Sequence, residues 1–271
     1  MWTSQQQDAR YSVHANRDRS SQPPLDYKAS KTTPWSFLNM HLARRFASFM
    51  LAVLVCSLVA APASAHFPWL AIDDEGHALY FFGEHVADRT YRMPERIKSA
   101  KIFHVDKDGK RSEIEFEGVE TDKFIGNRSA AKIAETGSLH SIAEYGIYAN
   151  TKLTYYTQHL LGKDAASWPN KPAADVALQG IAKKDTDGVS LQVFWQGKPL
   201  AGAKVQLFCD EGHEEGSATT NGDGVVQFTA KQVEDGLNGL LVGHVDNDSP
   251  GESNGKKYTG ESHYLTITCL D

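Results

Sequence analysis

His66 follows a run of small residues that has the form of a secretory cleavage site. The join reads Pro62-Ala63-Ser64-Ala65-His66, with alanine one and three residues before the expected cut. Cleavage after Ala65 would free the α-amine of His66, which could then close a chelate ring on one metal ion together with the imidazole Nδ1. An internal histidine has no such amine, so His66 is the first candidate metal ligand.

Four further histidines are candidate ligands. His244 lies in LLVGHVDND and His263 in SHYLTIT, and their imidazoles would converge if these two strand-like runs are neighbours. His159 and His104 are the other two, and at every one of these positions a buried, hydrogen-bonded structural histidine is the competing interpretation. Imidazole and amine nitrogens suit Ni(II), Co(II), Cu(II) and Zn(II), whereas Mg(II) and Ca(II) prefer oxygen. Because copper would bind such ligands most tightly, affinity alone does not name the metal.

Cys209 and Cys269 are the cysteines that follow residue 65, and they end the strand-like runs KVQLFC and YLTITC. In an oxidising compartment an even pair of cysteines is typical of a disulfide. We therefore predict a Cys209–Cys269 bridge, which would stabilise the fold by roughly 3 to 5 kcal/mol in the chain-entropy model. Two free thiolate ligands are the alternative, although no CxxC spacing supports them.

The segment before His66 has the order of a signal peptide. Arg44 and Arg45 precede the uncharged apolar run FASFMLAVLVCSLVAA, which is shorter than the about 20 residues that a membrane span needs. We predict a signal peptide over residues 40–65 and a periplasmic or secreted protein, with an N-terminal membrane anchor as the alternative. Residues 1–39 are polar and lack apolar periodicity, so we expect a disordered extension or a misassigned translation start, with Met40 as the true start.

The charge of the chain after the predicted cut argues against a nucleic-acid partner. Of 28 Lys and Arg and 34 Asp and Glu, seven bases and three acids lie in residues 1–65, which leaves 21 bases, 31 acids and a net charge of −10. An acidic surface repels nucleic acid and suits cations or simple solubility. The sequence also contains no G-x-S-x-G, H-E-x-x-H, P-loop or dinucleotide motif. We therefore expect a protein that is not an enzyme.

The candidate ligands must be positioned by β-strands, because short runs of β-branched and aromatic residues alternate with turn residues after residue 65. We predict an all-β fold of two antiparallel β-sandwich domains, Ig-like or transthyretin-like. The first would span residues 66–162 and the second residues 187–271. Residues 163–186 are rich in Ala, Pro and Lys, which predicts a linker.

The second half of the chain resembles a known class of sandwich domain. G-x-P-L-x-G-A-x-V spans residues 197–205 and T-x-x-x-G-x-x-x-F spans residues 220–228. This arrangement resembles the transthyretin-like or carboxypeptidase-regulatory-like domains, a likeness that implies a fold and no particular activity.

Three blocks of the chain resemble one bacterial family. AHFPWL (65–70) is similar to the A-H-x-x-W-L opening of the periplasmic components associated with nickel and cobalt energy-coupling-factor transporters, catalogued as a domain of unknown function. EYGIYANTKLTYYTQHL (144–160) and GLLVGHVDNDSPGESNGKKYTGESHYLTIT (239–268) resemble its middle and closing blocks. The resemblance implies a protein that binds nickel or cobalt and hands it to a separate membrane transporter. A structural or adhesion module without metal is the alternative, since regulatory-like domains commonly serve as scaffolds.

Overall fold

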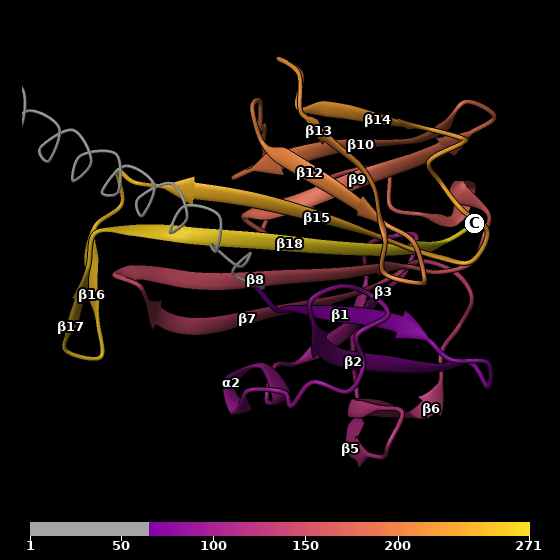
Figure 1. Ribbon diagram of the computed structural model, residues 1–271, viewed down its shortest axis with the longest axis horizontal. Coiled ribbons are helices and arrows are strands. Elements are labelled where there is room, and N and C mark those ends of the chain that lie inside the picture. Colours follow the sequence, from indigo (N-terminus) through magenta and orange to yellow (C-terminus); the bar gives the residue numbers. More distant parts are fainter. Residues whose placement is uncertain (1–64) are drawn as a thin grey trace, which may run out of the picture. The chain divides into compact units, whose positions relative to one another are not determined.

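An eight-stranded sheet forms the middle layer of the structure and contains strands from both halves of the chain. The computed structural model describes residues 65–271 (Figure 1). The strands of this central sheet are β3 (Ile102–Val105), β4 (Arg111–Ile114), β7 (Ser138–Tyr148), β8 (Thr151–Leu160), β12 (Lys204–Phe208), β13 (Glu214–Thr219), β15 (Leu237–Asp246) and β18 (Gly260–Leu270). Their order is β13-β12-β15-β18-β8-β7-β3-β4. The first and second halves of the chain therefore share one sheet.

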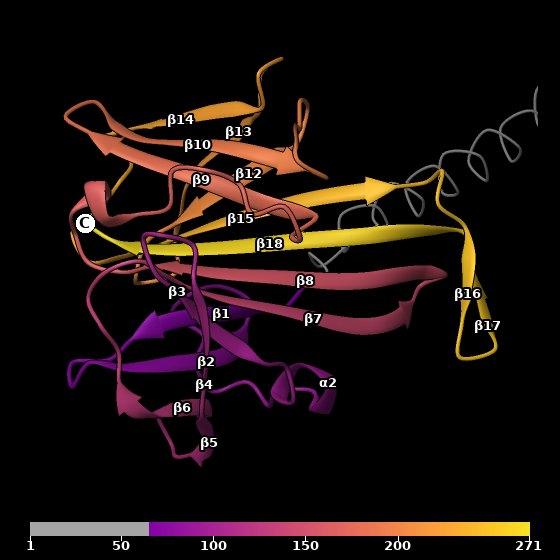
Figure 2. The same cartoon turned by 180° about the vertical axis from the view of Figure 1, so that it is seen from behind.

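Two smaller sheets cover the central sheet, one on each face (Figure 2). One has the order β1-β2-β6-β5 and consists of β1 (Phe67–Ile72), β2 (His77–Gly83), β6 (Ile125–Lys132) and β5 (Phe116–Glu120). In the other, β10 pairs with β9, β11 and β14; these are β9 (Leu178–Asp185), β10 (Gly188–Trp195), β11 (Lys198–Pro199) and β14 (Val225–Thr229). The remaining elements are the hairpin of β16 (Gly251–Ser253) and β17 (Lys256–Tyr258), the helix α2 (Glu95–Lys98) and a 3-10 turn (Ala165–Ser167).

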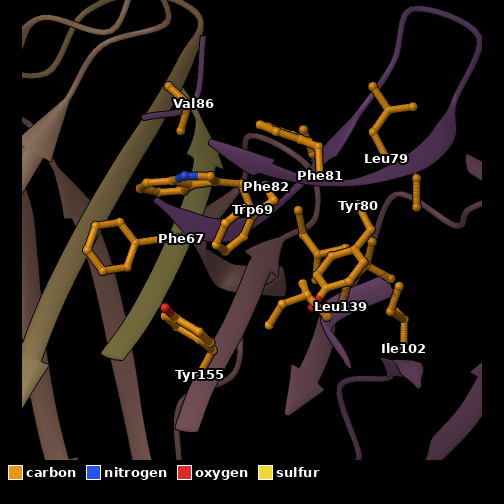
Figure 3. Packing of buried hydrophobic residues seen from close by; sticks show 14 of the residues in the cluster. Phe67, Trp69, Leu79, Tyr80, Phe81, Phe82, Val86, Ile102, Leu139 and Tyr155 are labelled. Atoms are coloured by element: carbon orange, nitrogen blue, oxygen red, sulfur yellow. The ribbon is translucent and has the colours of Figure 1, made fainter. Parts of the chain in front are cut away.

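Alternating side chains of the central strands enter two different cores. Successive residues of a strand point to opposite faces of the sheet. Tyr155 of β8 accordingly packs in the core beneath β1 and β2, while Tyr156 packs in the core beneath β9 and β10. Figure 3 shows the first of these cores, in which Trp69 and Phe81 are fully buried. The two faces of the central sheet are therefore two separate chemical environments.

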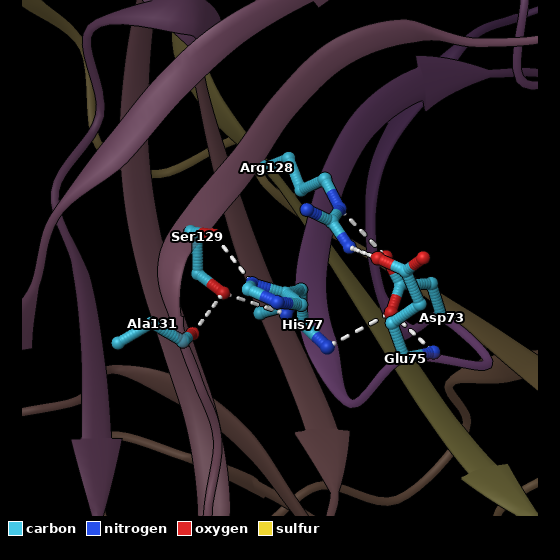
Figure 4. A network of polar contacts seen from close by, with 7 residues as sticks. Asp73, Glu75, His77, Arg128, Ser129 and Ala131 are labelled. Atoms are coloured by element: carbon cyan, nitrogen blue, oxygen red, sulfur yellow. Dashed lines mark hydrogen bonds and ion pairs between the residues drawn. The ribbon is translucent and has the colours of Figure 1, made fainter.

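The turn between β1 and β2 is held by a network of polar contacts (Figure 4). Asp73 Oδ1 accepts a hydrogen bond of 2.9 Å from the backbone N–H of His77, and Arg128 Nε donates to Asp73 Oδ2 at 2.7 Å. Burial raises the pKa of Asp73, but these hydrogen bonds outweigh it and lower the pKa overall. His77 Nδ1 lies 2.8 Å from the carbonyl oxygen of Ser129, so its ring has a structural partner.

The all-β prediction is confirmed, but the predicted division into two antiparallel sandwiches with a linker at 163–186 does not describe the structure. Strand β9 lies inside the predicted linker and pairs with β10 from Asp185 to Leu178. Strand β18 pairs in parallel with β8, which joins the last strand of the chain to the first half. Residues 65–271 belong to one compact unit. The composition of residues 163–177 is that of a connector, whereas the long-range pairing of β18 leaves no local signal.

Two predictions concern the start of the chain. The expected N-terminal extension (1–39) and signal peptide (40–65) lie outside the described residues, apart from Ala65. Across residues 65–271 no helix has both the length and the apolar character needed to cross a membrane.

Candidate metal centre

His244 and His263 lie directly opposite each other on the neighbouring strands β15 and β18. Their ring centroids are 6.2 Å apart, and the rings are inclined by 28°. The Nε2 atom of each ring is buried: that of His244 has no hydrogen-bond partner among residues 65–271, and that of His263 makes no well-aligned hydrogen bond there but lies near the Glu261 carboxylate. The two strands are therefore neighbours, which is the condition that the sequence analysis set for the imidazoles to converge.

Trp195, the last residue of β10, covers both imidazoles from the smaller sheet above. Its ring centroid lies 4.5 Å from that of His244 and 4.4 Å from that of His263. Burial lowers the pKa of both histidines. The carboxylates of Asp246 and Glu261 raise the pKa of His244 and His263 respectively, but burial is the larger effect. Both rings are therefore neutral at neutral pH, which is the form that binds a metal ion.

Two carboxylates accompany the histidine pair on the same face of the sheet. Asp246 and Glu261 are also cross-strand partners, and each lies two residues from one of the histidines. Glu261 Oε2 is 3.2 Å from His263 Nε2. Hydrogen bonds from Ser249 and the backbone lower the pKa of Asp246, so it is a carboxylate at neutral pH. Two imidazoles with two carboxylates form a donor set that suits a divalent first-row transition metal.

Tyr156 orients the ring of His263 from below. Its Oη lies 3.3 Å from His263 Nδ1. Burial raises the pKa of Tyr156 to about 12, so the phenol stays protonated and uncharged. When Nδ1 carries the ring proton and donates a hydrogen bond to Tyr156 Oη, the lone pair of Nε2 is left for a metal ion. The phenol would thus fix the tautomer of the ligand.

The structure places His66 on the other face of the central sheet. Its ring centroid is 3.8 Å from that of Tyr91, and its Nε2 is 3.8 Å from Asp88 Oδ2. The next residue, Phe67, packs against Tyr155 in the core that lies opposite His244 and His263. The expected site in which both ends of the mature chain close around one ion is therefore not formed. Side chains alternate between the two faces of a sheet. Proximity to β18 is therefore not sufficient to bring His66 to the face that carries His263.

His159 and His104 do not join the pair either. His159 is fully buried, its Nδ1 lies 2.8 Å from Thr268 Oγ1, and burial lowers its pKa to about 3. It pairs across the sheet with Leu139, which places it on the face that is covered by β1 and β2. His104 Nε2 lies 2.9 Å from the carbonyl oxygen of Thr136. Both rings have structural partners away from His244 and His263.

The predicted disulfide is not formed, because Cys209 and Cys269 are both free and buried. Cys269 pairs with Asn238 of β15, and Cys209 directly follows β12 on the other side of β15. Strands two apart in a sheet are separated by about 9 to 10 Å, beyond the about 7 Å that a disulfide can span between Cα atoms. The expectation failed because the run patterns KVQLFC and YLTITC do not reveal that a strand lies between them.

Several residues of the site escaped the sequence analysis. The spacing of Asp246 and Glu261, each two residues from a histidine, is a signal that period-two reasoning could have used. Trp195 and Tyr156 reach the site through tertiary packing and left no signal. Elsewhere, ligand atoms of Cys209, His213 and Glu215 lie within 4.8 Å of one another.

Two sequence comparisons identify no relative of the chain. No protein-family model matches the chain, and no curated protein matches it. The family that the sequence resembles is therefore untested by comparison, and the functional argument depends on the geometry of the site.

Proposed function

We propose that the protein is a non-enzymatic carrier of a divalent transition metal ion, with His244 and His263 as the central ligands. The observation that carries the proposal is the pair of buried Nε2 atoms on directly opposite residues. Within residues 65–271 that of His244 has no hydrogen-bond partner, and that of His263 lies 3.2 Å from Glu261 Oε2 without a well-aligned hydrogen bond. A buried polar atom without a partner costs about 1 to 3 kcal/mol, and an ion bound between the rings would remove that cost at His244. Asp246 and Glu261 would offset the charge of the ion.

Binding requires side-chain rotation at the site. Among residues 65–271, the histidine pair and its carboxylates do not form a set of three ligand atoms within 4.8 Å of one another. Trp195 covers both rings, so it is the side chain that must yield when the imidazoles turn toward a common ion. The fluorescence of Trp195 should therefore report binding, because Ni(II), Co(II) and Cu(II) quench a nearby indole.

The wider role follows from the sequence resemblance and is part of the proposal. A periplasmic or secreted location, nickel or cobalt as the cargo, and delivery to a separate membrane transporter agree with the blocks at residues 65–70 and 239–268. The nitrogen-rich donor set of the His244–His263 pair is compatible with nickel, cobalt or copper.

Calorimetric titration of the metal-free protein with Ni(II) tests the proposal. His244→Ala and His263→Ala should each weaken binding by more than tenfold, about 1.4 kcal/mol. His104→Ala is the matched control and should leave the affinity unchanged, because its ring bonds a backbone carbonyl instead. Circular dichroism of each variant verifies the fold.

Three other outcomes would count against the assignment. Unchanged affinity in His244→Ala and His263→Ala would refute the pair as the site. A loss confined to His66→Ala would place the ion at the N-terminus of a cleaved chain. Absence of binding by the wild-type protein would favour a structural or adhesion module without metal.

A further inference from the structure

The loop between β12 and β13 brings a thiol, an imidazole and a carboxylate together. Its sequence is Cys209-Asp210-Glu211-Gly212-His213, and β13 begins with Glu214 and Glu215. The backbone N–H of Cys209 donates to the carbonyl of His213 at 3.1 Å, and the N–H of Gly212 donates to the carbonyl of Cys209 at 3.0 Å. These two hydrogen bonds hold the first and last residues of the loop side by side.

The side chains of this loop converge as well as the backbone. Cys209 Sγ, a ring nitrogen of His213 and a carboxylate oxygen of Glu215 lie within 4.8 Å of one another. Cys209 Sγ also lies within 4.8 Å of carboxylate oxygens of Asp210 and Glu234. The thiol is fully buried, whereas 71 % of the His213 side chain is exposed, so the cluster has a buried base and an open side through which an ion can enter.

A second histidine from a different part of the chain lies against the same loop. His85 follows β2, and a Cβ placed on Gly212 would be only 2.2 Å from His85 Nδ1. This Nδ1 is buried and has no hydrogen-bond partner among the described residues. Gly212, with a φ of +87°, is the residue type that permits this close approach. His85 therefore brings an unpartnered ring nitrogen to the loop that carries the cluster.

The charge around the cluster favours a cation. Asp210, Glu211, Glu214 and Glu215 stand within seven consecutive residues that include no Lys or Arg. The guanidinium of Arg89 interacts electrostatically with Asp210. A locally acidic segment raises the local concentration of divalent ions.

We propose that Cys209, His213 and Glu215 form a second metal site, distinct from the His244–His263 pair, that takes Zn(II) or Co(II) through a thiolate. Binding replaces the S–H bond of Cys209 by a sulfur–metal bond and releases that proton to solvent, so no oxidant or reductant is required. Thiolate, imidazole and carboxylate are the three ligand types that Zn(II) prefers. His85 lies next to this set and completes the polar surroundings. The site does not depend on the function proposed for the histidine pair.

Cobalt(II) is the probe for this site, because a cobalt–thiolate bond gives an intense charge-transfer absorption in the near ultraviolet that nitrogen and oxygen ligands do not give. The full-length reduced protein should show this band on addition of Co(II), and Zn(II) should abolish it by displacement. Cys269→Ser is the matched control and should keep the band, because Cys269 is also buried but belongs to no such cluster. Cys209→Ser should remove it.

The exposed side of the cluster provides variants that cannot act through misfolding. His213→Ala changes a side chain that is 71 % exposed, and it should weaken cobalt binding by more than tenfold while the circular dichroism spectrum stays unchanged. The double variant His244→Ala/His263→Ala should retain the band, which separates this site from the pair. Absence of the band in the wild type, its persistence in Cys209→Ser, or unchanged affinity in His213→Ala would each overturn the proposal.

Discussion

Replacement of His159 should make the protein less sensitive to acid. The ring is fully buried, and burial lowers its pKa from 6.5 to about 3. Below pH 6.5 the unfolded chain binds a proton at this position that the folded chain does not bind, so stability falls as the pH decreases from 6.5 toward 3. Between pH 6.5 and pH 4, about 2.5 pH units, this histidine is protonated in the unfolded state and not in the folded state. At 1.36 kcal/mol per unit, the free energy of unfolding should decrease by about 3 kcal/mol between pH 7 and pH 4.

Urea unfolding of the metal-free protein at pH 7 and pH 4, followed by circular dichroism, measures this loss. His159→Gln keeps a polar group near Thr268 but cannot titrate, so its free energy of unfolding should fall by about 3 kcal/mol less than that of the wild type over the same pH range. The comparison between the two pH values cancels any cost of the substitution itself. His104→Gln, which removes a histidine elsewhere, should behave as the wild type.

The reasoning would be refuted if the wild type and His159→Gln lost the same stability between pH 7 and pH 4. Equal losses would mean that His159 is protonated in the folded protein or reaches solvent by local opening. A smaller loss in His104→Gln than in His159→Gln would show that the wrong histidine had been identified.

Two further predictions concern the packing of the fold. Gly239→Ala should destabilise the protein by about 1 to 3 kcal/mol, because a Cβ there would lie 2.4 Å from Val86 Cγ1 and 3.0 Å from Trp69 Cζ3. Gly222→Ala is the control: its Cβ would meet no atom within 4 Å, so it should change stability by less than about 0.5 kcal/mol in the same urea unfolding assay. Fluorescence and circular dichroism should report one coincident unfolding transition, because β18 joins both halves in one sheet, and two separated transitions would restore the two-domain interpretation.

Local patterns in the sequence predicted what depends on neighbouring residues and missed what depends on strand order. The short runs of β-branched and aromatic residues between turn residues predicted β-strands after residue 65, and the structure contains them. The residues of β18 do not themselves indicate whether the strand pairs with β8 or only with strands of the second half of the chain. The predicted linker includes β9, whose first five residues are buried, because the two lysines that follow them gave this segment the composition of a connector.

The candidate site shows the same division. His244 and His263 were identified from the sequence, and their meeting required only that two strands be adjacent. The expected partnership with His66 required knowledge of which face each side chain occupies, and a shift of one residue along a strand reverses that face. Trp195 was unpredictable for a further reason, since it reaches the imidazoles from another sheet.

The most direct test of the metal-carrier proposal is anomalous diffraction at the nickel absorption edge from crystals of the nickel-loaded protein. We predict a peak between the strands β15 and β18, at about 2 Å from the Nε2 atoms of His244 and His263, with the indole of Trp195 displaced. Nickel bound elsewhere, with no peak within bonding distance of either ring, would contradict the account.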